Sequence, residues 1–142
     1  MTKNDSIIGE IYDAWRAQDI AWLASYLPDD FCHAIHAPSD FHPLGGIARG
    51  KAASIERLGV IADDFDVVQF DTSGLIAQKD LVAVEIPIHY LHRETGTALE
   101  TTIANFWTLE DGWPVSLSEY HDLGRIQEFH YAVSSATGTL SE

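Results

Sequence analysis

Glu119 and His121 are ionisable side chains separated by one residue, close to the end of an apolar segment that runs from Trp113 to His121. Residues two apart on a strand point to the same face, so the two groups would converge if that face is inward. In an apolar cavity the carboxylate could fix the imidazole tautomer, or have its own pKa raised by burial, and both suit general acid–base catalysis. The alternatives are a solvated polar pair and a salt link between subunits.

His33 and Tyr90 are further candidates. His33 shares a strand face with Ile35 in an earlier apolar segment, which makes it a candidate second proton-transfer group. A buried histidine with a purely structural role is the alternative. Tyr90 lies on the bulky face of its segment and could donate a hydrogen bond to a substrate oxygen, or simply pack in the core.

A metal or nucleotide site is not expected. His33, His36, Asp40 and His42 lie close together, but on a strand His33 and His36 point to opposite faces. No HExxH, GxGxxG, Walker or GxSxG pattern occurs, and the single Cys32 excludes both a disulfide within the chain and a cysteine-rich zinc module. We therefore expect no metal and no cofactor, and regard Asp40 and His42 as possible rim residues of a pocket.

Two helical segments precede the main series of strands, which follows Asp63. Apolar residues recur with a helical period from Ile7 to Leu27, with a break near Gln18 and Asp19, and again from Lys51 to Ala62. A short strand is predicted over 31–37, and a turn-rich loop over 38–50. Asp122 is placed to cap a terminal helix over 123–133, and 134–142 is predicted to be frayed.

Four strand-like runs follow Asp63, over 67–77, 81–92, 98–109 and 113–121. Helices followed by an antiparallel meander indicate an α+β fold in which a curved sheet wraps around the N-terminal helices. In 81–92 the even positions are uniformly bulky, so we place them inside.

Composition limits the function classes. The chain has 142 residues, enough for one domain, which we assign to 1–142 with an ordered core of about 6–133. There are 22 acidic and 8 basic residues, a net charge of −14, which argues against nucleic-acid and anionic-membrane binding. The N-terminus is polar and no apolar run approaches about 18 residues, so we expect no membrane span, no signal peptide and a cytoplasmic location.

Several motifs, in this order, resemble the nuclear transport factor 2-like superfamily, especially its SnoaL-like polyketide cyclase and ketosteroid isomerase branches. They are Gln18-Asp19-Ile20 with Leu27-Pro28-Asp29-Asp30, then 45–52 (GGIARGKA), and finally Asp111-Gly112-Trp113 leading to Glu119-Tyr120-His121-Asp122. The resemblance implies a cone-shaped α+β barrel with a deep pocket, and a homodimer formed through the outer face of the sheet.

The resemblance also assigns positions. Counted without gaps, the isomerase tyrosine, base and acid positions fall at Ile11, Ile35 and Ala104, which argues against that chemistry, although a slip of one residue would bring Tyr12 or His36 closer. Glu119 matches an acidic residue of the epoxide hydrolases, whose arginine and aspartate partners map near Ile86 and Ile88. This departure argues against epoxide hydrolysis.

The leading hypothesis is a protein that binds an apolar, oxygen-bearing small molecule and catalyses a cofactor-free cyclisation, isomerisation or dehydration. Glu119 would be the acid or base, His121 its partner and His33 a second proton-transfer group. A pocket wall is expected from Trp15, Tyr12, Ile35, Tyr90, Ala104 and Leu117. The alternative is a non-catalytic binding or assembly module, with Glu85, His89, Asn105 and Trp107 as dimer contacts.

Overall fold

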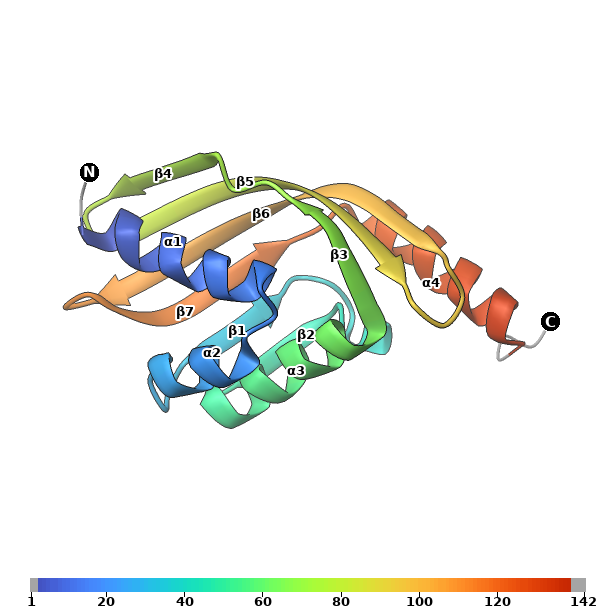
Figure 1. Cartoon of the computed structure of the whole chain (residues 1–142), viewed down its shortest axis with the longest axis horizontal. Helices are drawn as coiled ribbons and strands as arrows, with labels where there is room; N and C mark the ends of the chain where they lie inside the picture. Colours follow the sequence, from blue (N-terminus) through green and yellow to red (C-terminus); the bar gives the residue numbers. More distant parts are fainter. Residues whose placement is uncertain (1–2, 139–142) are drawn as a thin grey trace.

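The computed structural model describes residues 3–138 and begins with the helical region, which is two helices (Figure 1). They are α1 (Lys3–Arg16) and α2 (Ile20–Tyr26). The predicted break between them is present: Gln18 has a φ of 57°, and Asp19 caps α2 by accepting the Trp22 N–H. No helix in the described range 3–138 is long and apolar enough to cross a membrane.

The other helices are longer than predicted. The third, α3 (Lys51–Asp64), follows Gly50 directly. The last, α4 (Leu123–Thr137), begins at the predicted cap Asp122, whose carboxylate accepts the N–H groups of Gly124 and Arg125. It continues through 134–137, where a frayed end was predicted, and ends at Gly138 with a φ of 75°. Residues 139–142 lie outside the described range.

Seven strands form one curved, mixed sheet in the order β2-β1-β7-β6-β5-β3, and β4 also pairs with β5. All pairs are antiparallel except β1 with β7, which is parallel. Figure 1 shows α1 lying across one face of the sheet. A short 3-10 helix, η1 (Ser39–Phe41), follows β1. The strands are β1 (Cys32–Ile35), β2 (Gly46–Arg49), β3 (Phe65–Phe70), β4 (Gly74–Gln78), β5 (Leu81–His92), β6 (Ala98–Glu110) and β7 (Trp113–Tyr120).

The α+β cone predicted from the sequence is confirmed, with two differences in its strands. The run 67–77 is not one strand but parts of two, because β3 and β4 pair with opposite halves of the long β5 and a turn at Asp71 separates them. The segment 46–49, predicted as loop, is the strand β2. This strand begins at Gly46, and its four residues are too few to show an alternating pattern.

The two faces of the sheet are set by cross-strand pairing. Even-numbered residues of β5 are buried inside as predicted, and they pair with odd-numbered residues of β6, so that Val84 faces Asn105 and Val82 faces Trp107. Placing Asn105 and Trp107 on the outer face was therefore wrong: they are 2% and 3% exposed. Ala104, predicted to line the pocket, lies on the opposite, outer phase of β6.

Candidate active site

A cavity of about 60 Å³ lies between the helices and the inner face of the sheet. Its polar wall contains Tyr12 from α1, His33 from β1, Asn105 from β6 and Glu119 from β7, together with the polar edges of Tyr90 and Trp107. The cavity thus combines an apolar enclosure with convergent titratable groups. Its apolar wall is formed by Ile11, Trp15, Leu23, Leu27, Phe31, Leu44, Leu58, Ile61, Phe70, Ile103 and Leu117.

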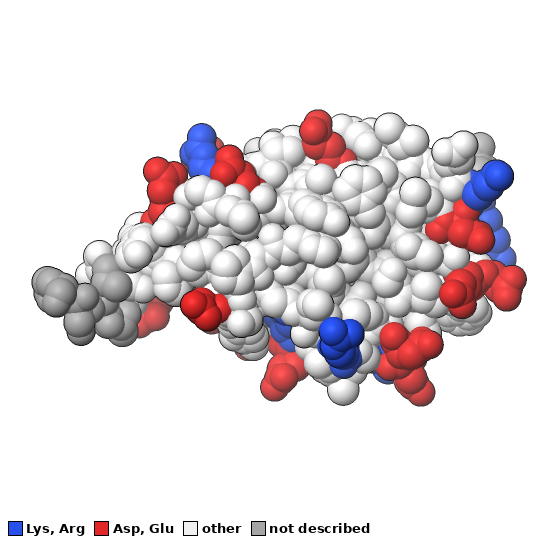
Figure 2. Space-filling model, turned by 180° about the vertical axis from the view of Figure 1, so that it is seen from behind, with Lys and Arg blue, Asp and Glu red and all other residues white. Residues whose placement is uncertain are grey.

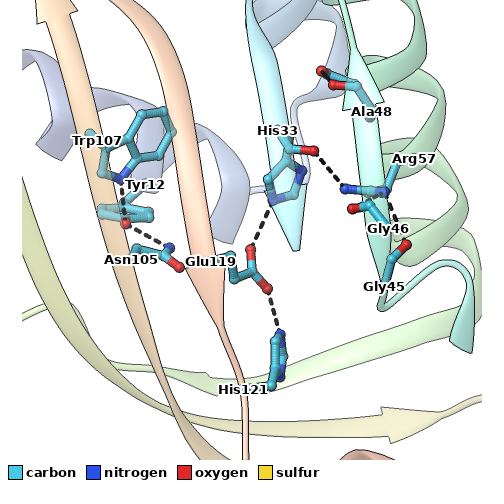
Figure 3. A network of polar contacts seen from close by, with 11 residues as sticks. Tyr12, His33, Gly45, Gly46, Ala48, Arg57, Asn105, Trp107, Glu119 and His121 are labelled. Carbon is cyan, nitrogen blue, oxygen red and sulfur yellow. Dashed lines mark hydrogen bonds and ion pairs between the residues drawn. The ribbon is translucent and has the colours of Figure 1, made fainter. Parts of the chain in front are cut away.

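The carboxylate of Glu119 lies between two imidazoles (Figure 3). Its Oε1 is 2.9 Å from Nε2 of His33, and its Oε2 is 2.6 Å from Nε2 of His121. The side chains of His33, His121 and Glu119 are 2%, 1% and 12% exposed. The sequence predicted the Glu119–His121 convergence, and the structure adds His33 to the same row.

The parallel pairing of β1 with β7 creates this row. In their register His33 lies opposite Leu117 and Ile35 opposite Glu119. His33, Leu117 and Glu119 all line the cavity, which places His33 within reach of the carboxylate. Ile35 is buried beside them but is not part of the cavity wall.

The row fixes the charge of Glu119. Burial acts to raise the pKa of this carboxyl, but the hydrogen bonds from His121 and His33 outweigh it and hold the pKa well below its usual range. Glu119 is therefore an ionised acceptor at neutral pH. Because a carboxylate can only accept, both Nε2 atoms carry their hydrogens.

With its hydrogen on Nε2, the uncharged form of an imidazole has its lone pair on Nδ1. The Nδ1 atoms of His33 and His121 are buried, and neither has a hydrogen-bond partner within residues 3–138. His33 lines the cavity, whereas His121 does not. Of the three groups in the row, His33 therefore combines an unused basic atom with a place on the cavity wall.

A second polar group is centred on Tyr12, whose hydroxyl accepts hydrogen bonds from Asn105 Nδ2 at 2.9 Å and from Trp107 Nε1 at 2.7 Å (Figure 3). Both partners donate, so the hydrogen of the hydroxyl remains available. Burial raises the pKa of Tyr12 and keeps the phenol protonated. Asn105 Oδ1 is a buried acceptor with no partner among the described residues.

Two polar residues of the cavity wall are direct neighbours of positions in the gapless count. The count placed the isomerase tyrosine and acid at Ile11 and Ala104, but the neighbouring residues Tyr12 and Asn105 face one another on the cavity wall. Ala104 itself lies on the outer phase of β6, because neighbouring residues on a strand point to opposite faces. At Ile86 and Ile88 the inner face of β5 is apolar, as the sequence indicated.

The remaining predicted residues differ in whether they reach the cavity. Trp15, Tyr90 and Leu117 line the cavity, whereas Asp40 and His42 are exposed in the loop after β1. His36 points to the outer face and stacks on Tyr120 at a ring distance of 4.2 Å. Among residues 3–138, no three histidine, cysteine, aspartate or glutamate side chains are grouped closely enough to hold a metal ion.

Sequence reasoning missed Arg57, a charged residue of α3 that is only 5% exposed. Its guanidinium donates to the carbonyl of His33 at 2.9 Å, and to those of Gly45 and Gly46 at 3.1 and 2.8 Å (Figure 3). Arg57 therefore holds β1 at His33 and anchors the turn before β2. The signal in the sequence was an arginine at a helix position that should be buried, in a chain with only 8 Lys and Arg residues.

Comparison with known families decides the relationship of the chain. The profile of the SnoaL-like domain matches residues 8–115. The chain belongs to the SnoaL-like family. The match includes His33 but ends before Glu119 and His121, so membership of the SnoaL-like family rests on the preceding elements and says nothing about those two residues. No curated protein matches this SnoaL-like sequence.

Solved structures share the nuclear transport factor 2-like fold of this SnoaL-like chain. A provisionally named isomerase from Rhodopseudomonas palustris has 20% identity and a TM-score of 0.78, over 93% of this chain and 98% of that one. TerC, crystallised with polyporic acid, has 22% identity and a TM-score of 0.77 over 90% and 98%. An epoxide hydrolase of the LEH-like type from M. tuberculosis has 12% identity and a TM-score of 0.73 over 97% and 98%. At these identities the likeness establishes the fold alone.

Proposed function

We propose that this protein is a cofactor-independent enzyme that moves a proton within an apolar, oxygen-bearing small molecule, as an isomerase, cyclase or dehydratase does. The observation that carries the proposal is the buried His33–Glu119–His121 row on the wall of an otherwise apolar cavity. Ionised groups are costly to bury, and perturbed carboxylates in cavities are concentrated at functional sites. Two structures of the same fold, a provisionally named isomerase and TerC crystallised with polyporic acid, agree with this class.

The roles follow from the free atoms. A carbonyl oxygen of the substrate would accept the hydrogen of the Tyr12 hydroxyl, which Asn105 and Trp107 leave unused. His33 would remove a proton from the carbon next to that carbonyl, leaving the electron pair on an enolate oxygen held by Tyr12. The carboxylate of Glu119 would stabilise the imidazolium that forms, and His121 would fix the orientation of Glu119. The proton returns to another atom of the same molecule.

Hydrogen–deuterium exchange tests this proposal without knowledge of the substrate. Cyclic ketones from cyclopentanone to 1-tetralone are incubated with the protein in D2O, and loss of the signal from the carbon next to the carbonyl is followed by NMR. We expect wild type to accelerate the exchange of at least one ketone and Glu119→Gln to lower the rate by about 100-fold. Glu128→Gln, an exposed change on α4, is the matched control.

A second proposal concerns assembly: two copies pair through the outer face of the sheet. Figure 2 shows a broad area without Lys, Arg, Asp or Glu in the view from behind, with charged side chains at its margins. Phe106 and Tyr120, 42% and 45% exposed, stack edge to face on the outer side of β6 and β7. With a net charge of −14, an uncharged face is where two copies repel least.

Phe106→Glu tests the assembly by light scattering. We expect wild type to have the mass of a dimer and Phe106→Glu that of a monomer, because a carboxylate would be buried at the contact. Val68→Glu, on the exposed part of β3, is the control and should remain dimeric. A monomeric wild type would refute the assembly. Trp107→Glu is unsuitable for this purpose, since Trp107 is in the core.

A further inference from the structure

A second hollow of about 170 Å³ lies outside the cavity, between the loop after η1 and the last helix α4. Aromatic rings dominate its wall. The ring centroids of Phe41 and His130 are 5.0 Å apart, and those of Phe65 and Phe129 are 5.6 Å apart. His92, from the end of β5, packs edge to face against Phe129. We call this hollow the outer chamber and the cavity beside Glu119 the inner chamber.

The two chambers meet at one side chain. Leu44 lines both of them, and it is the one residue that their walls share within the described chain. It is 4% exposed, so it is buried where the two walls meet and does not point into solvent. Phe65 of the outer chamber packs against Tyr90 of the inner chamber at 5.7 Å and continues this wall.

The backbone that carries Leu44 is held in place. Its N–H donates to the carbonyl of Phe41 at 2.7 Å, and the two following carbonyls, of Gly45 and Gly46, accept hydrogen bonds from Arg57. A Cβ on Gly45 would lie 2.0 Å from the Pro38 carbonyl oxygen, so the turn packs against backbone with no room for a side chain. Any change at the boundary between the chambers would therefore come from the Leu44 side chain and not from movement of the turn.

The sizes show how a ligand would use the two chambers. A space of about 60 Å³ holds only a few water-sized groups, whereas the outer chamber is nearly three times as large. Neither wall contains Lys or Arg, and each contains one carboxylate, Glu119 in the inner chamber and Asp64 in the outer one, so an anionic ligand would be repelled. The pair thus suits an uncharged molecule with a small oxygen-bearing end for the inner chamber and an aromatic ring for the outer one.

We infer that the two chambers form one divided substrate site, that the substrate is an uncharged oxygenated compound of two linked rings, and that Leu44 determines which molecules reach Glu119. This inference rests on the proposed function, whose site it extends. Leu44 acts as a specificity-determining residue because a smaller side chain would join the chambers and a larger one would close the inner chamber.

The test uses 4-phenylphenol as the probe and 13C-labelled histidine as the reporter. The ring signal of His33 reports the inner chamber and that of His130 the outer one. We expect 4-phenylphenol to shift both signals in wild type with one dissociation constant. In Leu44→Trp the His130 shift should persist while the His33 shift is lost, and in Leu44→Ala binding should tighten at least threefold. Leu81→Trp, an exposed leucine at the far end of β5, should behave as wild type.

Two results would overturn the inference: a His33 shift that survives in Leu44→Trp, or no His130 shift up to the solubility limit of the probe. Leu44→Phe replaces Leu44→Trp if the larger variant does not fold. The readout is occupancy and not turnover. Absence of proton exchange in wild type would therefore remove the proposed function and leave the divided site standing, whereas failure at Leu44 would leave the proton-transfer proposal standing.

Discussion

His33 and Glu119 are 86 positions apart in the chain, yet their side chains share a hydrogen bond of 2.9 Å. The parallel pairing of β1 with β7 places their backbones on neighbouring strands, and the common inward phase points both side chains at the cavity. An ionised carboxylate between two imidazoles is thus a product of the sheet register, and a change to any one of these three residues tests the same arrangement.

Glu119→Gln should lower the free energy of unfolding by about 1–3 kcal/mol at pH 6, because an amide cannot accept from both imidazoles and one buried donor loses its partner. The pKa of Glu119 is lower in the folded chain than its ordinary value of 4.5. Its ionised form therefore stabilises the fold above about pH 4.5, and this contribution is lost as the pH falls.

Urea denaturation at pH 6 and pH 3 measures this effect. The difference between wild type and Glu119→Gln should shrink at pH 3, while Glu128→Gln should match wild type at both values. A difference that is equal at the two pH values would show that Glu119 is not held ionised by the fold.

His33→Gln and His121→Gln separate the two imidazoles. A glutamine amide can replace the Nε2 donor to Glu119 but has no basic nitrogen. We expect His33→Gln to lower proton exchange by about 100-fold and His121→Gln by less than about tenfold, because only His33 lines the cavity. Equal losses of proton exchange in the two variants would mean that a place on the cavity wall does not decide which histidine acts as the base.

Tyr12→Phe removes the acceptor of two buried donors, Asn105 Nδ2 and Trp107 Nε1. It should reduce the free energy of unfolding by about 1–3 kcal/mol and also slow proton exchange, since the substrate oxygen loses its hydrogen-bond donor. Tyr131→Phe, on the exposed face of α4, is the control and should change neither quantity. Thermal unfolding and the exchange assay together would reveal a purely structural role, in which stability falls and the exchange rate of the folded fraction does not.

Arg57→Met leaves the carbonyls of His33, Gly45 and Gly46 without their donor. The expected loss of unfolding free energy is about 3 kcal/mol, since these are charge-assisted bonds in a buried site. Arg49→Met, an exposed change on β2, should stay within about 0.5 kcal/mol of wild type. Chemical denaturation of the two variants checks the difference, and equal stability would show that water replaces Arg57 at these carbonyls.

The elements with strong periodicity could be predicted from the sequence. The apolar spacing of α1 and α3, the even-numbered inner face of β5 and the Asp122 cap all appear as expected. β2 could not be predicted, because a four-residue strand beginning at a glycine carries no readable alternation. The division of the run 67–77 into β3 and β4 arises because both strands pair with the long β5. Such pairing is a property of the tertiary structure and cannot be read from the local sequence.

The candidate site could be predicted in part. The spacing of Glu119 and His121 on one strand face needs only the period of a strand, so their convergence was readable. The inner phase of β6 could not be read from the sequence, because it depends on which residues of β5 and β7 lie opposite. A slip of one residue moves every side chain of the strand to the other face of the sheet. Asn105 was misplaced for that reason, and Arg57 was missed because its partners are backbone carbonyls.

The position of β7 between β1 and β6 also bears on how the site arises during synthesis. His33 leaves the ribosome 86 residues ahead of Glu119, and His121 follows Glu119. Until they do, the β1–β2 hairpin has no strand connecting it to the rest of the sheet. Contacts between such distant parts of a chain slow folding, since a long loop must close first. Completion of the sheet and completion of the site are therefore the same late event, and a nascent chain that lacks β7 carries an imidazole without the carboxylate that orients it.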